Sequence, residues 1–174
     1  MVNLTSEFQE LYLKSQNGGE SEAVALLKFA YSNRNLNTQD VLAAADLVKE
    51  KLDPAPDFRR YQIGRLYRLG RFYTQATEIL EYLSYERGYA PAQWMLGRMV
   101  VYGEITSIDM EEAIEHLRAG QKNEHIRAPI TRLIVEIREA GWAFKMIKIA
   151  ILVPYIIRFR IYEDILKVKD YRMQ

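Results

Sequence analysis

The stretches YQIGRLYRLGRF (residues 61–72) and WMLGRMVVYGEI (residues 94–105) are two copies of one pattern. Each copy holds two glycines six residues apart, Gly64 and Gly70 in the first and Gly97 and Gly103 in the second. The two copies are therefore 33 residues apart. A period of about 30 to 40 residues is typical of stacked helix pairs. These stretches predict an all-α repeat protein.

The position of each glycine predicts its role. Gly64 and Gly97 lie inside apolar stripes with helical spacing, where glycine costs about 1 kcal/mol relative to alanine. We therefore expect a second helix to approach closely at both positions. Gly70 and Gly103 are expected to end the first helix of each pair in a glycine turn.

The second helix of each pair is marked by small and acidic residues. Ala76 and Ala113 lie inside apolar stripes and would keep that helix thin where it meets the first. Asp109 with Glu112 three residues later is typical of a capping box at a helix start. Three further helices are expected before residue 58, with Thr38 as a candidate cap for the third.

The second copy resembles the Sel-one-like repeat, a branch of the tetratricopeptide-type helical repeats. Seven positions carry the resemblance by residue type and spacing: Gly88, Ala92, Leu96, Gly97, Gly103, Asp109 and Ala113. The first copy matches at Ile63, Gly64, Tyr67, Gly70 and Ala76, with a shorter turn and no aspartate. Val100, Ile105 and His116 depart from the pattern, and a third unit from Ala128 lacks the internal glycine.

The resemblance implies a right-handed α-solenoid of stacked antiparallel helix pairs. Proteins that resemble this family are adaptors or scaffolds, many of them bacterial, and some act in envelope assembly, polysaccharide production or signalling. The predicted organisation is a set of about three degenerate N-terminal helices (1–57), a repeat region (58–141) and an apolar, basic C-terminal segment (142–174).

The residues that carry chemistry are sparse and scattered. The chain has no cysteine and only two histidines. His116 lies four residues after Glu112, but a zinc site needs three or four converging ligands. We therefore interpret His116 as a polar surface residue or a filler of the repeat's aromatic position. The sequence predicts no catalytic residue, no metal site, no cofactor and no enzyme activity.

A basic helical face in the first copy is the candidate partner surface. Arg60, Arg65, Arg68 and Arg71 fall within an arc of about 140° on a helix. Arg65, Tyr67 and Arg68 are the predicted protein-binding residues. RNA binding is a further alternative, but the net charge of +1 gives the whole chain no attraction for nucleic acid. The other alternative is a solvated face that pairs with glutamates of the next helix.

The C-terminal stretch WAFKMIKIAILVPYIIRFRIY (residues 142–162) is the most apolar part of the chain. Its uncharged run covers only the nine residues 149–157, whereas a spanning helix needs about 20. From residue 142 onward, seven Lys or Arg and three acids give a net charge of +4, which leaves −3 for the rest. Three interpretations stay open: a membrane-surface element, a cap on the repeat stack, and a protein interface such as a homodimer.

The favoured hypothesis is an adaptor for a protein partner that attaches to an anionic membrane surface. The N-terminus lacks a signal peptide pattern, so we expect a cytoplasmic protein, peripheral to the inner face of the membrane. A soluble scaffold without lipid contact is the alternative. The predicted membrane contacts are Trp142, Phe144, Lys145, Lys148, Ile151, Leu152, Tyr155, Ile156, Arg158, Phe159 and Arg160.

Overall fold

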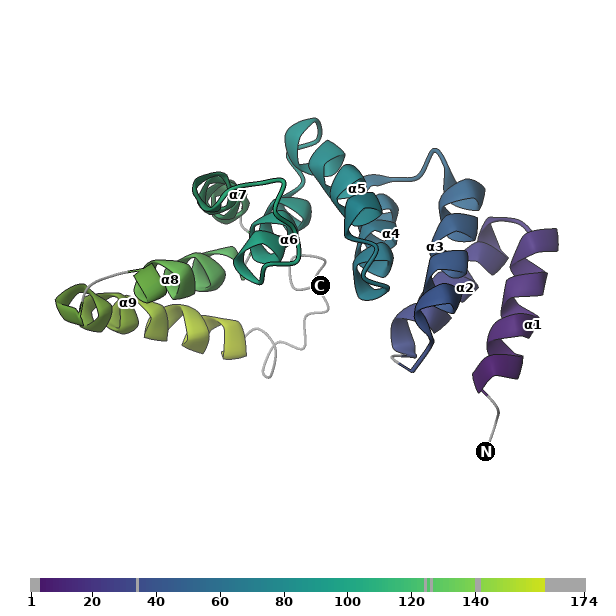
Figure 1. The fold of residues 1–174 in the computed structure, drawn as a ribbon, viewed down its shortest axis with the longest axis horizontal. Coiled ribbons are helices and arrows are strands. Elements are labelled where there is room, and N and C mark those ends of the chain that lie inside the picture. Colours follow the sequence, from purple (N-terminus) through teal and green to yellow (C-terminus); the bar gives the residue numbers. More distant parts are fainter. Residues whose placement is uncertain (1–3, 34, 124, 126, 140–141, 162–174) are drawn as a thin grey trace. The chain divides into compact units, whose positions relative to one another are not determined.

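A computed structural model describes residues 4–33, 35–123, 125, 127–139 and 142–161. Within these residues the regular structure is entirely helical, as the sequence predicts (Figure 1). The helices are α1 (Leu4–Asn17), α2 (Glu20–Ser32), α3 (Thr38–Leu52), α4 (Asp57–Leu69), α5 (Tyr73–Tyr85), α6 (Ala90–Val101), α7 (Met110–Lys122), α8 (Ala128–Glu139) and α9 (Trp142–Arg160).

The chain divides into two compact units, residues 1–79 (unit 1) and residues 80–174 (unit 2). The division falls inside α5, between Ile79 and Leu80. In unit 1, α1 packs against α2, α2 against α3 and α3 against α4, and in unit 2, α6 packs against α7, α7 against α8 and α8 against α9. Contacts also join α2 to α4 and α6 to α8, so each unit is held by near neighbours in sequence. The division predicted from the sequence, into residues 1–57, 58–141 and 142–174, stays a prediction.

Unit 1 contains α1 to α4 and the first half of α5 (Figure 1). Two prolines separate α3 from α4, because proline cannot continue a helix interior. The third helix begins one residue earlier than expected. Asn37, not Thr38, caps it, since the Asn37 side-chain oxygen accepts from the backbone N–H of Asp40 at 2.9 Å. Thr38 is the first helical residue.

The turn after α4 differs from the expected glycine turn. Gly70 has a right-handed φ of −74°, and Arg71 takes the left-handed position with a φ of 65°. The backbone N–H groups of Arg71 and Phe72 bond the carbonyls of Arg68 and Tyr67, as in a Schellman motif. Glycine is needed at position 70 for a steric reason and not for its backbone conformation. A Cβ there would lie 2.8 Å from the Phe72 ring and 3.0 Å from Val41.

The turn after α6 has the same hydrogen bonds but places its glycine one position later. Gly103 is itself left-handed, with a φ of 68°. Its N–H bonds the carbonyl of Val100, and the N–H of Glu104 bonds that of Met99. The two turns therefore have the same structure, but their glycines have different roles. Gly70 leaves room for the Phe72 ring and Val41, whereas Gly103 takes the left-handed conformation.

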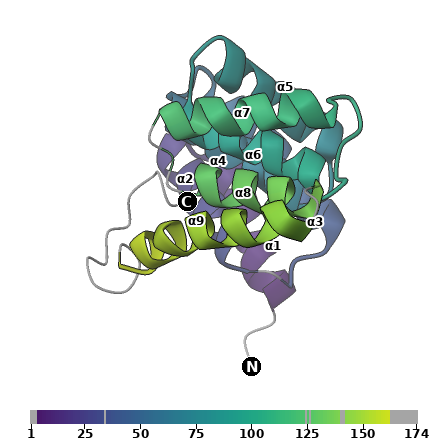
Figure 2. The same cartoon turned by 90° about the vertical axis from the view of Figure 1, so that its left-hand side faces the viewer.

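Unit 2 depends on a close contact between α6 and α7. Gly97 lies in α6, and a Cβ at this position would be 2.6 Å from Cγ of Leu117 and 2.8 Å from the backbone oxygen of Ala113. The buried residues of α6 include Ala92, Leu96 and Met99, all at 0% exposure. Figure 2 shows α7, α8 and α9 lying one below the other, and α8 contacts both of its neighbours.

Replacing Gly97 by alanine tests this contact. Alanine favours the helix by about 1 kcal/mol, but overpacking costs about 1–3 kcal/mol, and the backbone oxygen of Ala113 cannot move aside cheaply. We expect Gly97→Ala to lower the free energy of unfolding, measured by urea denaturation. Gly120→Ala is the comparison variant: its Cβ would lie 3.3 Å from that of Ala128, a milder contact, so its loss should be the smaller of the two. A Gly97→Ala protein as stable as the parent would contradict the prediction.

Candidate functional site

Helix α9 exposes an apolar face. Within the described residues, eight large apolar side chains of this helix are exposed: Phe144, Met146, Ile147, Ile149, Ile151, Val153, Ile156 and Ile157. Their exposed fractions run from 41% at Ile156 to 65% at Phe144. Large apolar patches on a protein surface mark sites of interaction with proteins, ligands or membranes.

The opposite face of α9 packs on the rest of unit 2. Five side chains at helical spacing are half-buried: Lys145, Lys148, Leu152, Tyr155 and Phe159. Two of the five are lysines, whose aliphatic stems can cover apolar surface while their charged ends reach polar partners. The usual arrangement of a surface helix is thus inverted, because the outward face is more apolar than the inward one.

Two contacts fix which face of α9 is turned inward. Lys148 Nζ lies 2.9 Å from Oε2 of Glu136 on α8, and this carboxylate also meets Arg132 at 3.6 Å. The guanidinium of Arg127 lies over the Phe159 ring, 5.1 Å from its centroid, and 5.7 Å from the centroid of Trp94. An ion pair and a cation–π contact therefore hold the two ends of the inward face.

The charge on α9 is of one sign. Its 19 residues include Lys145, Lys148, Arg158 and Arg160 and no acid. Arg158 and Arg160 are exposed at its C-terminal end, next to the apolar face. Within the described part of the chain, no helix combines the length and apolarity that a bilayer crossing requires. At about 1.5 Å per residue, α9 is roughly 28 Å long.

The structure sorts the predicted membrane contacts by face. Phe144, Ile151, Ile156, Arg158 and Arg160 are exposed. The other predicted contacts that it describes lie on the inward face: Lys145, Lys148, Leu152, Tyr155 and Phe159. The side chain of Trp142 is outside the described residues. Met146, Ile147, Ile149, Val153 and Ile157 belong to the outward face, although the sequence argument did not select them.

The predicted partner surface on α4 is mostly covered. Tyr67 is 1% exposed, and its hydroxyl donates to Oδ1 of Asp46 at 2.6 Å. Burial and this hydrogen bond raise the pKa of Tyr67. Arg65 is half-buried, with its guanidinium 4.5 Å from the centroid of the Tyr31 ring. Arg68 is also half-buried. Tyr67 is therefore placed in the interior of unit 1.

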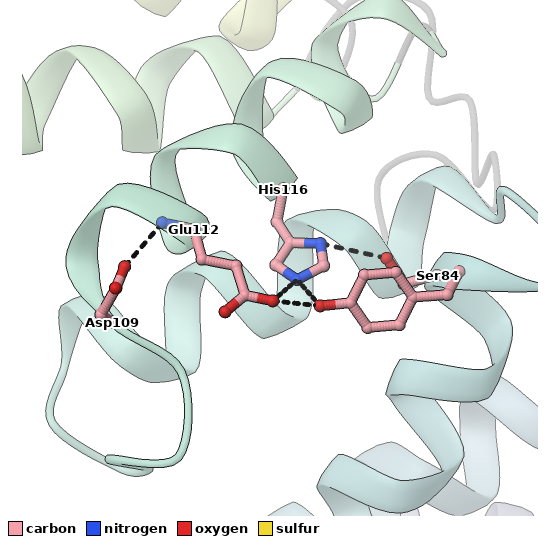
Figure 3. Close-up of polar contacts among 5 residues, drawn as sticks. Ser84, Asp109, Glu112 and His116 are labelled. Atoms are coloured by element: carbon pink, nitrogen blue, oxygen red, sulfur yellow. Dashed lines mark hydrogen bonds and ion pairs between the residues drawn. The ribbon is translucent and has the colours of Figure 1, made fainter.

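A polar network joins the end of α5 to α7 (Figure 3). His116 is 5% exposed, and its Nδ1 lies 3.1 Å from Oγ of Ser84. Its Nε2 lies 3.0 Å from the hydroxyl of Tyr85 and 4.0 Å from Oε1 of Glu112. The Tyr85 hydroxyl donates to that same carboxylate oxygen. Asp109 caps α7 by accepting from the backbone N–H of Glu112 at 2.9 Å.

This network replaces half of the predicted capping box. The Asp109 half is present, but the Glu112 side chain bonds Tyr85 instead of returning to the start of its own helix. Burial raises the pKa of Tyr85 to about 12, with further contributions from Glu112 and Glu81. The spacing of Glu112 and His116 placed them on one helix face, but no sequence signal showed that Ser84 and Tyr85 would face them.

The serine and the imidazole of this network are both covered. Ser84 is 5% exposed, so its hydroxyl is covered although it lies beside an imidazole. Among the described residues, no group of three or more His, Cys, Asp or Glu side chains is arranged to hold a metal ion. His116 occupies an interior position, which favours the interpretation of a filler in the repeat's aromatic position.

Comparison with protein-family models, curated proteins and solved structures finds no match for this chain. The resemblance to the Sel-one-like repeat therefore stays a hypothesis that rests on its seven positions. The functional argument depends on the geometry of α9 and on the charges around it.

The Asp109 cap is expected to stabilise α7, the helix that carries Glu112 and His116, and this can be tested. Replacing Asp109 by alanine removes the acceptor for the Glu112 N–H, which costs about 1 kcal/mol at a helix N-terminus. We expect Asp109→Ala to lower the free energy of unfolding by that amount in urea denaturation. Asp109→Asn keeps the acceptor and should retain most of the stability. Equal losses in the two variants would show that the hydrogen bond from the Glu112 N–H is not what stabilises α7.

Proposed function

We propose that this protein is a helical-repeat adaptor that attaches to an anionic membrane surface through the outward face of α9. Its helix pairs are those of a Sel-one-like, right-handed α-solenoid, and it has no enzymatic role. The protein partner binds elsewhere on the repeats, with Arg65 and Arg68 as the candidate contacts on α4. The cytoplasmic face of the membrane suits this attachment, because anionic lipids are enriched there.

The observation that carries the proposal is the apolar outward face of α9. Full burial of one large apolar side chain stabilises by about 1.5–3 kcal/mol, and α9 leaves eight such side chains exposed. A helix that lies in the interface buries its apolar face roughly 5–10 Å into the boundary between headgroups and acyl chains. Even partial insertion of these side chains provides enough free energy for attachment.

The charges on α9 favour lipid over a second copy of the chain. A basic residue near an anionic membrane contributes about 1 kcal/mol. Arg158 and Arg160 are exposed beside the apolar face, and α9 has no acid to repel the lipid phosphates. In a dimer through the same face, the exposed cations Arg158 and Arg160 would meet a second α9 that offers them no acid and carries the same two cations. Like charges in such a contact oppose association.

The geometry also argues against α9 as a simple cap on the repeats. A terminal cap needs a polar outer face. Here the residues that cover α8 include Lys145 and Lys148, while the isoleucines point outward. An adaptor of this kind would hold a protein partner at a membrane. By resemblance, bacterial envelope assembly, polysaccharide production and signalling are the settings in which such an adaptor would act.

Flotation with lipid vesicles tests the apolar contact. Replacing Ile147 and Ile151 together by glutamine removes two exposed apolar side chains one helical turn apart. At roughly 1 kcal/mol or more for each side chain, we expect the vesicle partition coefficient to fall about tenfold or more. Leu13→Gln is the matched control, because Leu13 is 57% exposed on α1. Unchanged flotation of the double variant would contradict the proposal.

The basic contact has a separate test. We expect Arg158→Gln with Arg160→Gln to weaken binding to phosphatidylglycerol-containing vesicles roughly 30-fold, at about 1 kcal/mol per charge. Binding to pure phosphatidylcholine vesicles should change little. Sedimentation equilibrium without lipid distinguishes the alternatives. A dimer that the Ile147 and Ile151 substitutions break would assign the face to a second copy instead of lipid.

A further inference from the structure

Helix α9 is held in its helical form by contacts within unit 2. Five of its described side chains are half-buried against the rest of the unit. The ion pair of Lys148 with Glu136 at 2.9 Å and the contact of Arg127 with the Phe159 ring at 5.1 Å hold the two ends of this inward face. Binding to lipid therefore does not have to fold the helix, and its apolar side chains already project outward.

Most of the circumference of α9 faces outward. At about 100° per residue, the five half-buried side chains fall within an arc of about 80°. The eight exposed large apolar side chains, from Phe144 to Ile157, lie on the remaining arc. Six of these eight are isoleucine or valine, which are bulky close to the backbone. To insert, this face has to displace lipid at the boundary between headgroups and acyl chains.

The cations of α9 add a smaller contribution than its apolar side chains. Lys145 and Lys148 belong to the inward face, and Lys148 is paired with Glu136. Arg158 and Arg160 are exposed and two residues apart, so they lie about 160° apart around the helix, with apolar surface between them. They can reach headgroups on both sides of the inserted face. With eight apolar side chains against two exposed cations, insertion supplies the larger part of the attachment.

Pro154 keeps α9 at the boundary and out of the hydrocarbon core. Proline has no N–H, so the carbonyl of Ala150 lacks the donor that an α-helix provides four residues later. Both residues are exposed, on the outward side of the helix. A carbonyl without this donor needs water or a headgroup, and the hydrocarbon core offers neither. The helix therefore inserts to a shallow depth and pushes the headgroups of one leaflet apart.

We propose that the outward face of α9 selects membranes by lipid packing, and that its partner is an anionic surface whose headgroups are loosely packed. This inference rests on the proposed function and adds the property of the membrane that the face recognises. Gaps between headgroups widen where a leaflet bends outward or contains lipids with small headgroups, and bulky side chains insert more readily there. The attraction of Arg158 and Arg160 depends instead on the surface charge.

Vesicle size at a fixed lipid composition separates packing from charge. Flotation of the full chain uses dioleoylphosphatidylcholine vesicles with about 30% dioleoylphosphatidylglycerol, at diameters of about 30 nm and about 200 nm and equal outer-leaflet lipid. We expect a partition coefficient about fivefold to tenfold higher for the small vesicles. In the large vesicles, exchanging about half of the phosphatidylcholine for phosphatidylethanolamine with the same chains should also raise it, because the smaller headgroup loosens packing at unchanged charge.

Two pairs of substitutions assign the preference to the apolar side chains. Ile147→Ala with Ile151→Ala keeps the face apolar but removes bulk, so the ratio of binding between small and large vesicles should fall. Arg158→Gln with Arg160→Gln should weaken binding to both sizes by the same factor, because the surface charge is equal, and should retain the ratio.

The outcomes separate the packing preference from the function on which it rests. Equal partition to the two vesicle sizes, with binding intact, would overturn the packing preference and leave membrane attachment as proposed. An unchanged ratio in the Ile147 and Ile151 variant would also overturn it, provided that circular dichroism shows the helix content of the parent. Binding of the parent chain to none of the vesicles would overturn the proposed function as well.

Discussion

The contact of α6 with α7 at Gly97 is the constraint on which unit 2 depends. The helix backbones approach so closely there that a single methyl group would collide with Leu117 and with the backbone of Ala113. The short distance between α6 and α7 sets where α7 lies in unit 2. It therefore also sets where His116 contacts the end of α5. Helix α8 packs on α7, and α9 packs on α8, so each later helix inherits the same geometry.

The helices of unit 2 differ in how completely they are buried. Helix α6 has buried side chains on nearly every face, whereas the described side chains of α9 cover its neighbour with five that are half-buried and none that is fully buried. The difference follows from position in the stack, since α6 has contacts with both α7 and α8 and α9 has a strong contact with α8. Helix α9 nevertheless has the composition of an interior helix. Its unsatisfied apolar surface is therefore the feature of the described chain that most needs an external partner.

Local patterns predicted the helices well, because glycine, proline and apolar spacing act within a few residues of one another. They failed where a tertiary contact decided the outcome. Gly70 serves packing against Phe72 and Val41, so the left-handed turn residue is Arg71. The sequence also could not predict which face of α9 points outward. A helix that is apolar all round has no periodicity that distinguishes one face from another. Tyr67 was selected by its neighbourhood in sequence and lies in the core.

The restriction of contacts to neighbouring helices has a kinetic consequence for each unit. Little chain entropy is lost before such contacts form, so helices can pack as soon as their immediate predecessor exists. During synthesis, unit 1 would then fold before α9 is made. The apolar face of α9 would emerge late, on a chain whose earlier helices are already in place. The nascent chain would thus expose this apolar face only after its earlier helices have packed.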